Sequence, residues 1–175
     1  MNKQTLRSSM LSQRAALDKA AIDVASQQIA KVFLDRYGQY ESFLLYSPVR
    51  GEVDAAYIAQ ELWQAGKTVF YPRVAGESLL LGVCKSFDDL EAGYKGILEP
   101  KLANIINCKH IDVAVIPALA FDTDNYRLGY GKGFYDRFLA AITIAHKVGI
   151  AYRWQIVDTV YPETHDQRVD TVIVY

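Results

Sequence analysis

The sequence predicts an α/β fold in which helices cover the faces of a largely parallel sheet. Short apolar runs typical of buried strands stand at residues 42–46 and 112–116, and segments with helical periodicity alternate with such runs. Residues 42–71 contain a strand, a helix and a second strand in that order, which is the crossover unit of a parallel sheet. Because the 175 residues contain no linker, repeat or low-complexity segment, we expect one domain spanning residues 1–175.

The first segment is helical. The pattern predicts a helix over residues 3–36 with a break near Leu17. Asp18 is suited to cap the second part, because an Asp side chain accepts hydrogen bonds from the free N–H groups of a first helical turn. Apolar residues then recur at helical spacing, namely Ile22, Ala25, Ile29, Val32 and Phe33.

The crossover unit follows. Residues 42–46 are predicted to form a buried strand, and a helix begins after Asp54, which we interpret as its N-cap. Gly66 is a natural stop for this helix. The next strand, residues 67–71, is expected to end at Pro72 because proline cannot donate to a sheet.

The second half contains further strands and one helix. Residues 85–107 are the least regular part, with a helical turn over Asp88–Glu91 and loops at Gly93, Gly96 and Pro100. A helix is expected from Gly133 to about Ala145, with Phe134, Phe138, Leu139 and Ile142 buried. The remaining strands are predicted at residues 78–83, at 112–116 in the centre of the sheet, at 148–152 and at 169–174.

Charge and composition exclude several classes of protein. Nineteen Lys and Arg against twenty Asp and Glu leave a net charge of −1, whereas proteins that coat nucleic acids carry a basic surface. With 51% hydrophobic residues the chain is not of the disordered class. Neither a signal peptide nor a run of the roughly 20 apolar residues that span a membrane is visible. Cys84 and Cys108 have no metal-ligand spacing and suit a reducing compartment, so we expect a cytoplasmic protein without nucleic-acid or membrane partners.

A glycine cluster at residues 127–136 is the most informative segment. Alternate glycines at 129, 131 and 133 allow close approach of an anion to the backbone, and the predicted helix behind them offers free N–H groups. Arg127 and Lys132 add two cations. The spacing matches neither the dinucleotide fingerprint nor the Walker loop, because Phe134 stands where the first needs glycine and Gly133 where the second needs Ser or Thr. The alternatives are an unusual phosphate site, with Asp136 as a magnesium ligand, or simply a tightly turned loop.

Three other places are candidate sites. Lys3, Arg7 and Arg14 share one face of the first helix, which is either a solvated basic face or, if it meets the glycine loop, part of an anion site. Glu52 follows the first strand, where sheets of this kind bind ligands. Asp166 is a possible second carboxylate for a metal. His110, His146 and His165 lack the spacing of zinc ligands, and no nucleophile motif is present.

An ordered set of motifs runs along nearly the whole chain. The set comprises Lys3-x-x-Leu6-Arg7, Glu52-Val-Asp54, Pro72-Arg73, Gly96-Ile-Leu-Glu-Pro100, Pro117-Ala-Leu-Ala-Phe-Asp122, Arg127-Leu-Gly-Tyr-Gly-Lys-Gly-Phe-Tyr-Asp-Arg137, Gln155, His165-Asp166 and Val169-Asp170. Together these motifs resemble those of the 5-formyltetrahydrofolate cyclo-ligases, also called methenyltetrahydrofolate synthetases. Two positions depart from the family pattern, since Ala118 and Asn125 stand where glycine is usual. Asn125 is a mild change, because Asn tolerates the left-handed conformation better than most residues, and Ala118 is also a small residue. Neither change removes a charged or metal-binding group, so the expected activity is unaffected.

The resemblance implies an ATP- and Mg²⁺-dependent cyclo-ligase that forms a C–N bond. Such an enzyme converts 5-formyltetrahydrofolate to 5,10-methenyltetrahydrofolate through a phosphorylated formyl group (an iminium phosphate) and releases ADP and phosphate. Positioning and charge neutralisation, more than a protein nucleophile, are what this chemistry needs. The implied fold is a three-layer α/β/α arrangement like that of ribose-phosphate isomerases and CoA transferases. We expect a monomer, acting on a substrate that can be polyglutamylated.

The resemblance also assigns residues. Lys3 to Arg7 and Arg127 to Tyr135 would hold ATP, Asp136 and Asp166 would hold Mg²⁺, and Lys132, Arg127 and Tyr135 would be catalytic. Glu52 would bind the pterin or its formyl group near Tyr46, and the loop from Tyr130 to Phe134 would lie between the two substrates. In full, the implied ATP residues are Lys3, Gln4, Thr5, Leu6, Arg7, Arg127, Leu128, Gly129, Tyr130, Gly131, Lys132, Gly133, Phe134 and Tyr135, and the implied folate residues are Tyr46, Glu52, Tyr130, Gly131, Lys132, Gly133, Phe134, Tyr152 and Trp154.

Two other functions fit the same features less completely. A sugar-phosphate isomerase would use an anion loop and carboxylates without ATP, but it would leave the basic face of the first helix unexplained. A folate- or nucleotide-binding protein without turnover would bind the same ligands but would form no ADP.

Overall fold

The structure is a computed structural model that describes residues 2–175. Its helices are α1 (Lys3–Ala15), α2 (Lys19–Tyr37), α3 (Ala56–Gln64) and α4 (Phe134–Ala141), with short 3-10 turns η1 (Phe87–Asp89), η2 (Tyr94–Gly96), η3 (Leu102–Asn104) and η4 (Arg153–Gln155). Its strands are β1 (Ser42–Leu44), β2 (Thr68–Ala75), β3 (Ser78–Cys84), β4 (Leu90–Ala92), β5 (Leu98–Pro100), β6 (Ile105–Ile106), β7 (His110–Ile116), β8 (Ala120–Asp122), β9 (Arg127–Leu128), β10 (Thr143–Ala151), β11 (Ile156–Val157) and β12 (Thr171–Val174).

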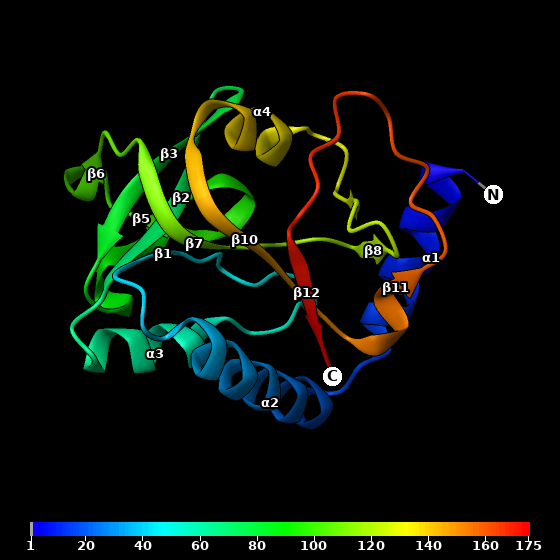
Figure 1. The fold of residues 1–175 in the computed structure, drawn as a ribbon, viewed down its shortest axis with the longest axis horizontal. Coiled ribbons are helices and arrows are strands. Elements are labelled where there is room, and N and C mark those ends of the chain that lie inside the picture. The colour runs from blue at the N-terminus through cyan, green and yellow to red at the C-terminus, as the bar shows by residue number, and fades with distance from the viewer. Residues whose placement is uncertain (1) are drawn as a thin grey trace.

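A seven-stranded sheet in the order β12-β10-β7-β1-β2-β3-β6 forms the centre of the molecule (Figure 1). The strands from β12 to β2 run parallel, whereas β3 and β6 join antiparallel at one edge. The predicted crossover of β1, α3 and β2 is present, and β7 lies between β1 and β10 as expected of a central strand. The prediction of an α/β fold with a mostly parallel sheet is therefore confirmed.

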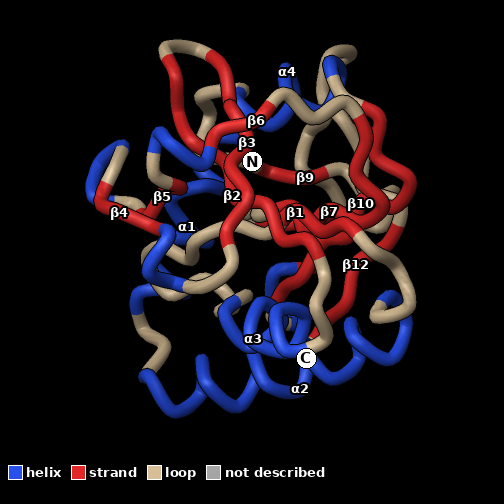
Figure 2. Tube along the Cα trace, turned by 90° about the vertical axis from the view of Figure 1, so that its left-hand side faces the viewer, coloured by secondary structure: helices blue, strands red, loops and turns tan. Residues whose placement is uncertain are grey.

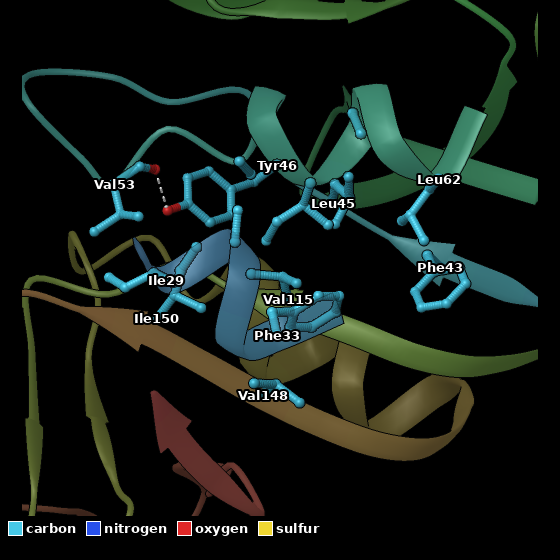
Figure 3. Close-up of a cluster of buried hydrophobic side chains, with 14 of the residues drawn as sticks. Ile29, Phe33, Phe43, Leu45, Tyr46, Val53, Leu62, Val115, Val148 and Ile150 are labelled. Atoms are coloured by element: carbon cyan, nitrogen blue, oxygen red, sulfur yellow. Dashed lines mark hydrogen bonds between the residues drawn. The ribbon is translucent and has the colours of Figure 1, made fainter. Parts of the chain in front are cut away.

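Helices cover both faces of this sheet. Viewed edge-on in Figure 2, α2 and α3 lie on one side and α4 on the other. On the first side, Ile29 and Phe33 of α2 pack with Val115 and Val148 of the sheet, as Figure 3 shows. On the second side, Phe138 and Leu139 of α4 belong to another buried cluster with Leu44, Phe70 and Ile116. Because successive strand residues point to opposite faces, β1 supplies Phe43 to one core and Leu44 to the other.

The two N-terminal helices follow local rules of capping. The predicted break near Leu17 is present, and the Asp18 side chain accepts a hydrogen bond from the Ala21 N–H at 2.7 Å. Asn2 caps α1 in the same way through the N–H of Thr5. Ahead of α3 the predicted cap is wrong, because the N-cap position is occupied by Ala55 and no side chain caps the helix. Asp54, one residue earlier, accepts a hydrogen bond from the Ala56 N–H at 2.9 Å.

Two predicted boundaries are wrong. β2 continues through Pro72 to Ala75 instead of ending at the proline. Phe70 directs its carbonyl group toward Leu45, and Pro72, two residues later, has its nitrogen on the same side, beyond the last paired residue of β1. The missing N–H therefore leaves no ladder bond unmade. Pro100, expected in a loop, lies in β5 and is paired with Leu90 of β4.

The helix that begins after Gly133 is shorter than predicted. It ends at Ala141, and Ile142 is already extended, with φ −126° and ψ 146°. Residues 142–144 are all β-branched, and β10 starts here because it can pair with β7 from Thr143 onward. Phe138 and Leu139 are buried as predicted, whereas Phe134 and Ile142 are only partly buried.

A small sheet in the order β11-β8-β9 extends from the carboxyl ends of the central strands. Leu6 and Met10 of α1 pack against Leu119, Leu128 and Val160 around it. This packing places α1 beside the segment that carries the glycine cluster. No helix within residues 2–175 has both the length and the apolar character that crossing a membrane would require.

Candidate active site

One cavity of about 780 Å³ collects most of the predicted site residues. It opens beyond the carboxyl ends of β1 and β7, where parallel sheets commonly bind ligands. Five segments build its wall: α1, the loop after β1, the end of β2 with the β4–β5 hairpin, the glycine loop, and residues 163–166. The predicted residues that line it are Lys3, Arg7, Tyr46, Glu52, Arg127, Leu128, Gly129, Tyr130, Gly131, Lys132, Gly133, Phe134, Tyr135, Asp136 and Asp166.

The basic face of α1 meets the glycine loop. Arg7 donates from Nε to the carbonyl oxygen of Gly129 at 2.9 Å. Its guanidinium also lies close to Gly131, where an added Cβ atom would stand 3.5 Å from Cζ of Arg7. Of the two interpretations of this face, a solvated surface and part of an anion site, the contact favours the second.

The glycine loop has the backbone of an anion cradle. Gly131 and Gly133 have φ angles of 91° and 66°, which glycine adopts without the strain that other residues incur. Gly133 is the N-cap of α4, and no side chain caps this end, so the first N–H groups of the helix remain available to a ligand. Lys132, between these glycines, is exposed and lines the cavity.

Arg127 is fixed at the base of this loop. Its guanidinium donates to Asp136 Oδ1 at 2.7 Å and lies 5.6 Å from the centre of the Tyr135 ring. Nε of Arg127 is buried without a hydrogen-bond partner among the described residues. Burial also raises the pKa of Tyr135, which keeps its hydroxyl group protonated at neutral pH.

Glu52 is the centre of a buried polar cluster. Its side chain is 5% exposed and Oε1 accepts hydrogen bonds from Arg14 at 3.3 Å and from the Tyr130 hydroxyl at 3.0 Å. Oε2 accepts from the Val49 N–H at 3.0 Å. Burial raises the pKa of Glu52 even though Arg14 and these hydrogen bonds favour the carboxylate. Both oxygens are therefore occupied, and only the Tyr130 contact comes from the glycine loop.

Asp166 is tied to the start of α1. Lys3 Nζ donates to Asp166 Oδ2 at 2.7 Å and to Glu163 Oε1 at 2.9 Å. Burial alone would raise the pKa of Asp166, but the hydrogen bonds from Lys3 and from the Glu163 N–H outweigh it and lower the pKa. This pair joins residues that are 163 positions apart at one wall of the cavity.

Some predicted site residues lie elsewhere. Gln4, Thr5 and Leu6 do not line the cavity: Leu6 is in the core, and the N–H of Thr5 is used in the cap of α1. Tyr152 and Trp154, which the resemblance implies for the folate site, do not line this cavity either. They stack on each other beside a separate, shallower depression next to α2, and the Tyr152 hydroxyl donates to the Gly51 carbonyl at 3.0 Å.

The comparisons with known proteins agree on one family. The model of the 5-formyltetrahydrofolate cyclo-ligase family matches residues 1–175. The chain belongs to the 5-formyltetrahydrofolate cyclo-ligase family. A 5-formyltetrahydrofolate cyclo-ligase of Mycoplasma pneumoniae is 31% identical over 178 residues, which cover 99% of this chain and 98% of that protein. The Escherichia coli K12 cyclo-ligase is 34% identical over 131 residues, covering 70% of this chain and 71% of the relative.

Solved structures give the same answer. The NMR structure of the Aquifex aeolicus 5,10-methenyltetrahydrofolate synthetase superimposes with a TM-score of 0.88 at 31% identity, over 99% of this chain and 90% of that one. The Mycoplasma pneumoniae synthetase superimposes with a TM-score of 0.80 at 28% identity, over 99% and 98% of the two chains. The mixed α/β fold with its large, mostly parallel sheet is thus the fold of this cyclo-ligase family.

Sequence reasoning misses several residues that line the cyclo-ligase cavity and the burial of Arg14, which contacts the lining residue Glu52 without lining the cavity itself. Arg14 was placed on the basic face of α1, but it is buried at 2% exposure and donates to Glu52, Tyr130 and the Ala118 carbonyl. A signal was present, because Arg14 stands four residues after the core residue Met10, at the border between the basic and apolar faces. Also missed were Val74, Leu79 and the hairpin residues Tyr94, Lys95, Ile97, Leu98 and Glu99.

The carboxylates offer the cyclo-ligase an incomplete metal site. No group of three or more His, Cys, Asp or Glu side chains in the part of the chain that the structure describes could enclose a metal ion. Asp136 and Asp166 both line the cavity, and Asp136 Oδ1 accepts from the N–H of Gln167, the neighbour of Asp166. Oxygen ligands from one or two carboxylates, completed by phosphate and water, suit Mg²⁺. The residues therefore fit a magnesium ion that arrives with a phosphate.

Proposed function

We propose that this protein uses ATP and Mg²⁺ to convert 5-formyltetrahydrofolate to 5,10-methenyltetrahydrofolate, with release of ADP and phosphate. The observation that carries the proposal is the meeting of the α1 cations with the glycine loop in one cavity, opposite the buried Glu52. The names of the relatives supply the substrate, and the cation-lined loop supports a nucleoside triphosphate as the second reactant. We also propose that residues 1–175 form one domain, with a fold like that of ribose-phosphate isomerases and CoA transferases. The protein would act as a monomer in the cytoplasm, on folate substrates that carry one or more glutamates.

The reaction requires activation of a poor leaving group. The formyl oxygen attacks the γ-phosphorus of ATP, the bond to ADP breaks, and the iminium phosphate forms. N10 then attacks the formyl carbon and loses its proton, and the C–O bond breaks with release of phosphate, which accepts that proton, so that the methenyl bridge remains. Because both steps move negative charge, catalysis depends on fixed cations and positioning.

The residues have distinct proposed roles. Lys3, Arg7, Arg127 and Lys132 neutralise the phosphates, and the glycine loop donates backbone N–H groups to them. Arg127 is held in place by Asp136, so its charge is positioned before ATP binds. Tyr135 keeps its proton and can donate a hydrogen bond to the transferring group. When bound, Mg²⁺ would add charge neutralisation at the phosphates, held by Asp136 and Asp166.

Glu52 is proposed to bind the amide or amine edge of the pterin. A buried carboxylate accepts such N–H donors in the bidentate or paired geometry that a pterin edge presents. Tyr46 is close, and its hydroxyl group donates to the Val53 carbonyl at 2.7 Å, which fixes the loop that carries Glu52 (Figure 3). The pterin would replace the Tyr130 hydroxyl group at Oε1, because Tyr130 is the one partner of Glu52 that belongs to the glycine loop, which is proposed to bind the phosphates.

The direct test mixes the protein with 5-formyltetrahydrofolate, ATP and Mg²⁺ and follows the ultraviolet absorbance of the methenyl product together with ADP. We expect stoichiometric formation of both. Binding without ADP would favour a folate- or nucleotide-binding protein, and turnover of a sugar phosphate without ATP would favour an isomerase. Either result would refute the proposed cyclo-ligase activity.

Asp136→Asn tests the proposed metal role. Loss of one carboxylate should raise the Mg²⁺ concentration needed for half-maximal turnover by about tenfold, since about 1.4 kcal/mol of lost binding corresponds to that factor. Asp124→Asn, an exposed change ahead of the glycine loop, is the matched control and should leave it unchanged. An unaltered Mg²⁺ requirement in Asp136→Asn, with circular dichroism like that of the parent, would refute the role.

A further inference from the structure

The cavity contains more positive charge than its own carboxylates neutralise. Every acidic side chain in its wall has a basic partner: Glu52 with Arg14, Glu99 with Arg73, Asp136 with Arg127, and Glu163 and Asp166 with Lys3. Four lining cations, by contrast, make no ion pair within residues 2–175, and these are Arg7, Arg50, Lys95 and Lys132. The site is therefore built to receive several negative charges.

These four cations do not form one group. Arg7 and Lys132 belong to the contact between α1 and the glycine loop, which is the proposed phosphate site. Arg50 stands two residues before Glu52, at the proposed pterin end. Lys95 is different, because it reaches the cavity from η2, the turn that joins β4 to β5. In Figure 2 this hairpin lies beside β2 at one side of the molecule.

The turn that carries Lys95 is tightly built. Lys95 has a φ of 53°, a left-handed conformation that costs a lysine energy and persists only where the surroundings impose it. The N–H of Gly93 donates to the Ile97 carbonyl at 2.8 Å and closes the turn. Tyr94 also meets Phe134 of the glycine loop edge-to-face, with 6.0 Å between the ring centres. Lys95 is thus held at an exposed position on the rim.

The hairpin beneath this turn is anchored to the central sheet. Arg73 of β2 donates to the Pro100 carbonyl at 2.8 Å and to Glu91 at 2.9 Å. Glu99, which is buried, accepts from the Val74 N–H at 3.1 Å. Between these anchors and Lys95, the cavity wall is apolar, with Leu79, Ile97 and the 48%-exposed Leu98. An apolar wall that ends in a free cation suits a ligand with a ring followed by an anionic end.

We propose that Lys95 binds the carboxylates of the glutamate tail of the folate substrate, with Ile97 and Leu98 packed against the aminobenzoyl ring. The inference rests on the proposed function, which places the pterin at Glu52 and the phosphates at Arg7 and Lys132. A folate carries its carboxylates at the end opposite the pterin, so the remaining free cation at the open rim is the one available to them. Lys95 then selects folates over pterins that lack the tail.

The test compares Lys95→Gln with Lys101→Gln, a matched control on the same segment whose side chain does not line the cavity. KM should be measured for 5-formyltetrahydrofolate, for 5-formyltetrahydropteroate, which lacks the glutamate, and for ATP. For an exposed ion pair, Lys95→Gln should raise KM for the glutamate-bearing substrate about two- to fivefold, and Lys95→Glu should raise it further. KM for the tail-less substrate and for ATP should not change.

Three outcomes would overturn the assignment. A higher KM for ATP would place Lys95 at the phosphates. Equal effects on both folate substrates would show that the turn only positions the wall. Unchanged values throughout would leave Lys95 without a role in binding.

If the wild type shows no turnover, the proposed function fails, and the tail site is decided separately by binding. Titration of p-aminobenzoylglutamate into wild type and Lys95→Gln, followed by NMR, should then show weaker binding to the variant. Equal binding would contradict the site.

Discussion

Arg14 shows how one buried charge organises the end of the cavity that contains Glu52. Its side chain is almost fully buried and donates to Glu52, to the Tyr130 hydroxyl and to the Ala118 carbonyl. An added Cβ atom at Gly51 would lie 3.1 Å from Arg14 Cγ, so this glycine accommodates the arginine stem. The Arg14–Glu52 pair therefore joins α1 to the loop after β1 with no water between the charges.

Removal of Arg14 should destabilise the protein strongly. Arg14→Met would leave the Glu52 carboxylate buried without its counter-charge, which typically costs about 3–5 kcal/mol in the free energy of unfolding. Burial raises the pKa of Glu52 in the folded state, so this carboxyl group takes up a proton as the pH falls toward its pKa in the unfolded chain. The protonated group needs no counter-charge, and the difference in the free energy of unfolding between wild type and Arg14→Met should therefore shrink in acid. Urea unfolding at neutral and acidic pH measures both effects.

Tyr130→Phe is the matched comparison, because it removes the hydroxyl group that donates to Glu52 and accepts from Arg14 while it leaves both charges in place. Its cost should be about 1 kcal/mol. Because the Tyr130 hydrogen bond lowers the pKa of Glu52 less than the charge of Arg14 does, this cost should depend on pH more weakly than that of Arg14→Met. An Arg14→Met deficit as small as this, or one that grows in acid, would contradict a buried ion pair.

The sequence could predict which residues share the α1 face but not how deeply each is buried. Helical spacing places Lys3, Arg7 and Arg14 together, as observed. The fate of each depends on distant segments: Lys3 meets Asp166, Arg7 meets Gly129, and Arg14 lies under Glu52. Local periodicity contains no information on those partners: it places Arg14 next to the apolar face of the helix, but it does not show that Glu52 covers this side chain.

At the scale of elements, helix starts and parallel strands were predictable and the middle segment was not. Asp18 and Gly66 are local signals whose effect depends on the adjacent backbone alone. The β4–β5 hairpin has strands of three residues each, too short for an alternating pattern. What fixes it is tertiary contact, above all Arg73 with Glu91, Glu99 and Pro100.

Gly82 of β3 is the point where this hairpin rests on the central sheet. A Cβ atom there would stand 2.4 Å from Cβ of Pro100, far inside contact distance. Gly82→Ala should therefore push β5 away and destabilise the protein by about 1–3 kcal/mol. Hydrogen exchange should show the loss of protection concentrated in residues 90–100, whereas Ser78→Ala on the same strand should leave exchange there unchanged. A uniform loss of protection across the central sheet would contradict a displacement confined to β5.

At the scale of the whole molecule, the cavity is assembled from both ends of the chain. Lys3 of α1 bridges Asp166 and Glu163, so the first helix is clasped to the segment before β12. Figure 1 shows α1 beside the red loop that leads to β12. From the residues alone these ends are separate candidate sites, and the resemblance assigns them to ATP and to Mg²⁺. The fold places both in the wall of one cavity.

The stabilising effect of the Lys3–Asp166 ion pair should be lost in acid. The pKa of Asp166 is lowered in the folded state, so its stabilising effect is present above its unfolded pKa and is lost as the pH falls through the folded pKa. Asp166→Asn should thus be less stable than wild type at neutral pH, and the two should converge in acid. Asp158→Asn, an exposed change in the same segment, serves as control. Thermal unfolding across pH 2–7 measures the difference, and a gap that widens in acid would contradict the sign.

The unpaired cations of the cavity also affect how fast ligands arrive. Residues 1–19 and 127–137 each have a net positive charge, whereas the whole chain has a net charge of −1. The rest of the chain is therefore negative overall and repels anions. A recessed positive site with low-dielectric walls concentrates field lines at its mouth, and such focusing raises association rates by about 10- to 1,000-fold. At physiological ionic strength this attraction extends only about 8 Å. The cavity therefore selects its anionic ligands during approach, before any hydrogen bond has formed.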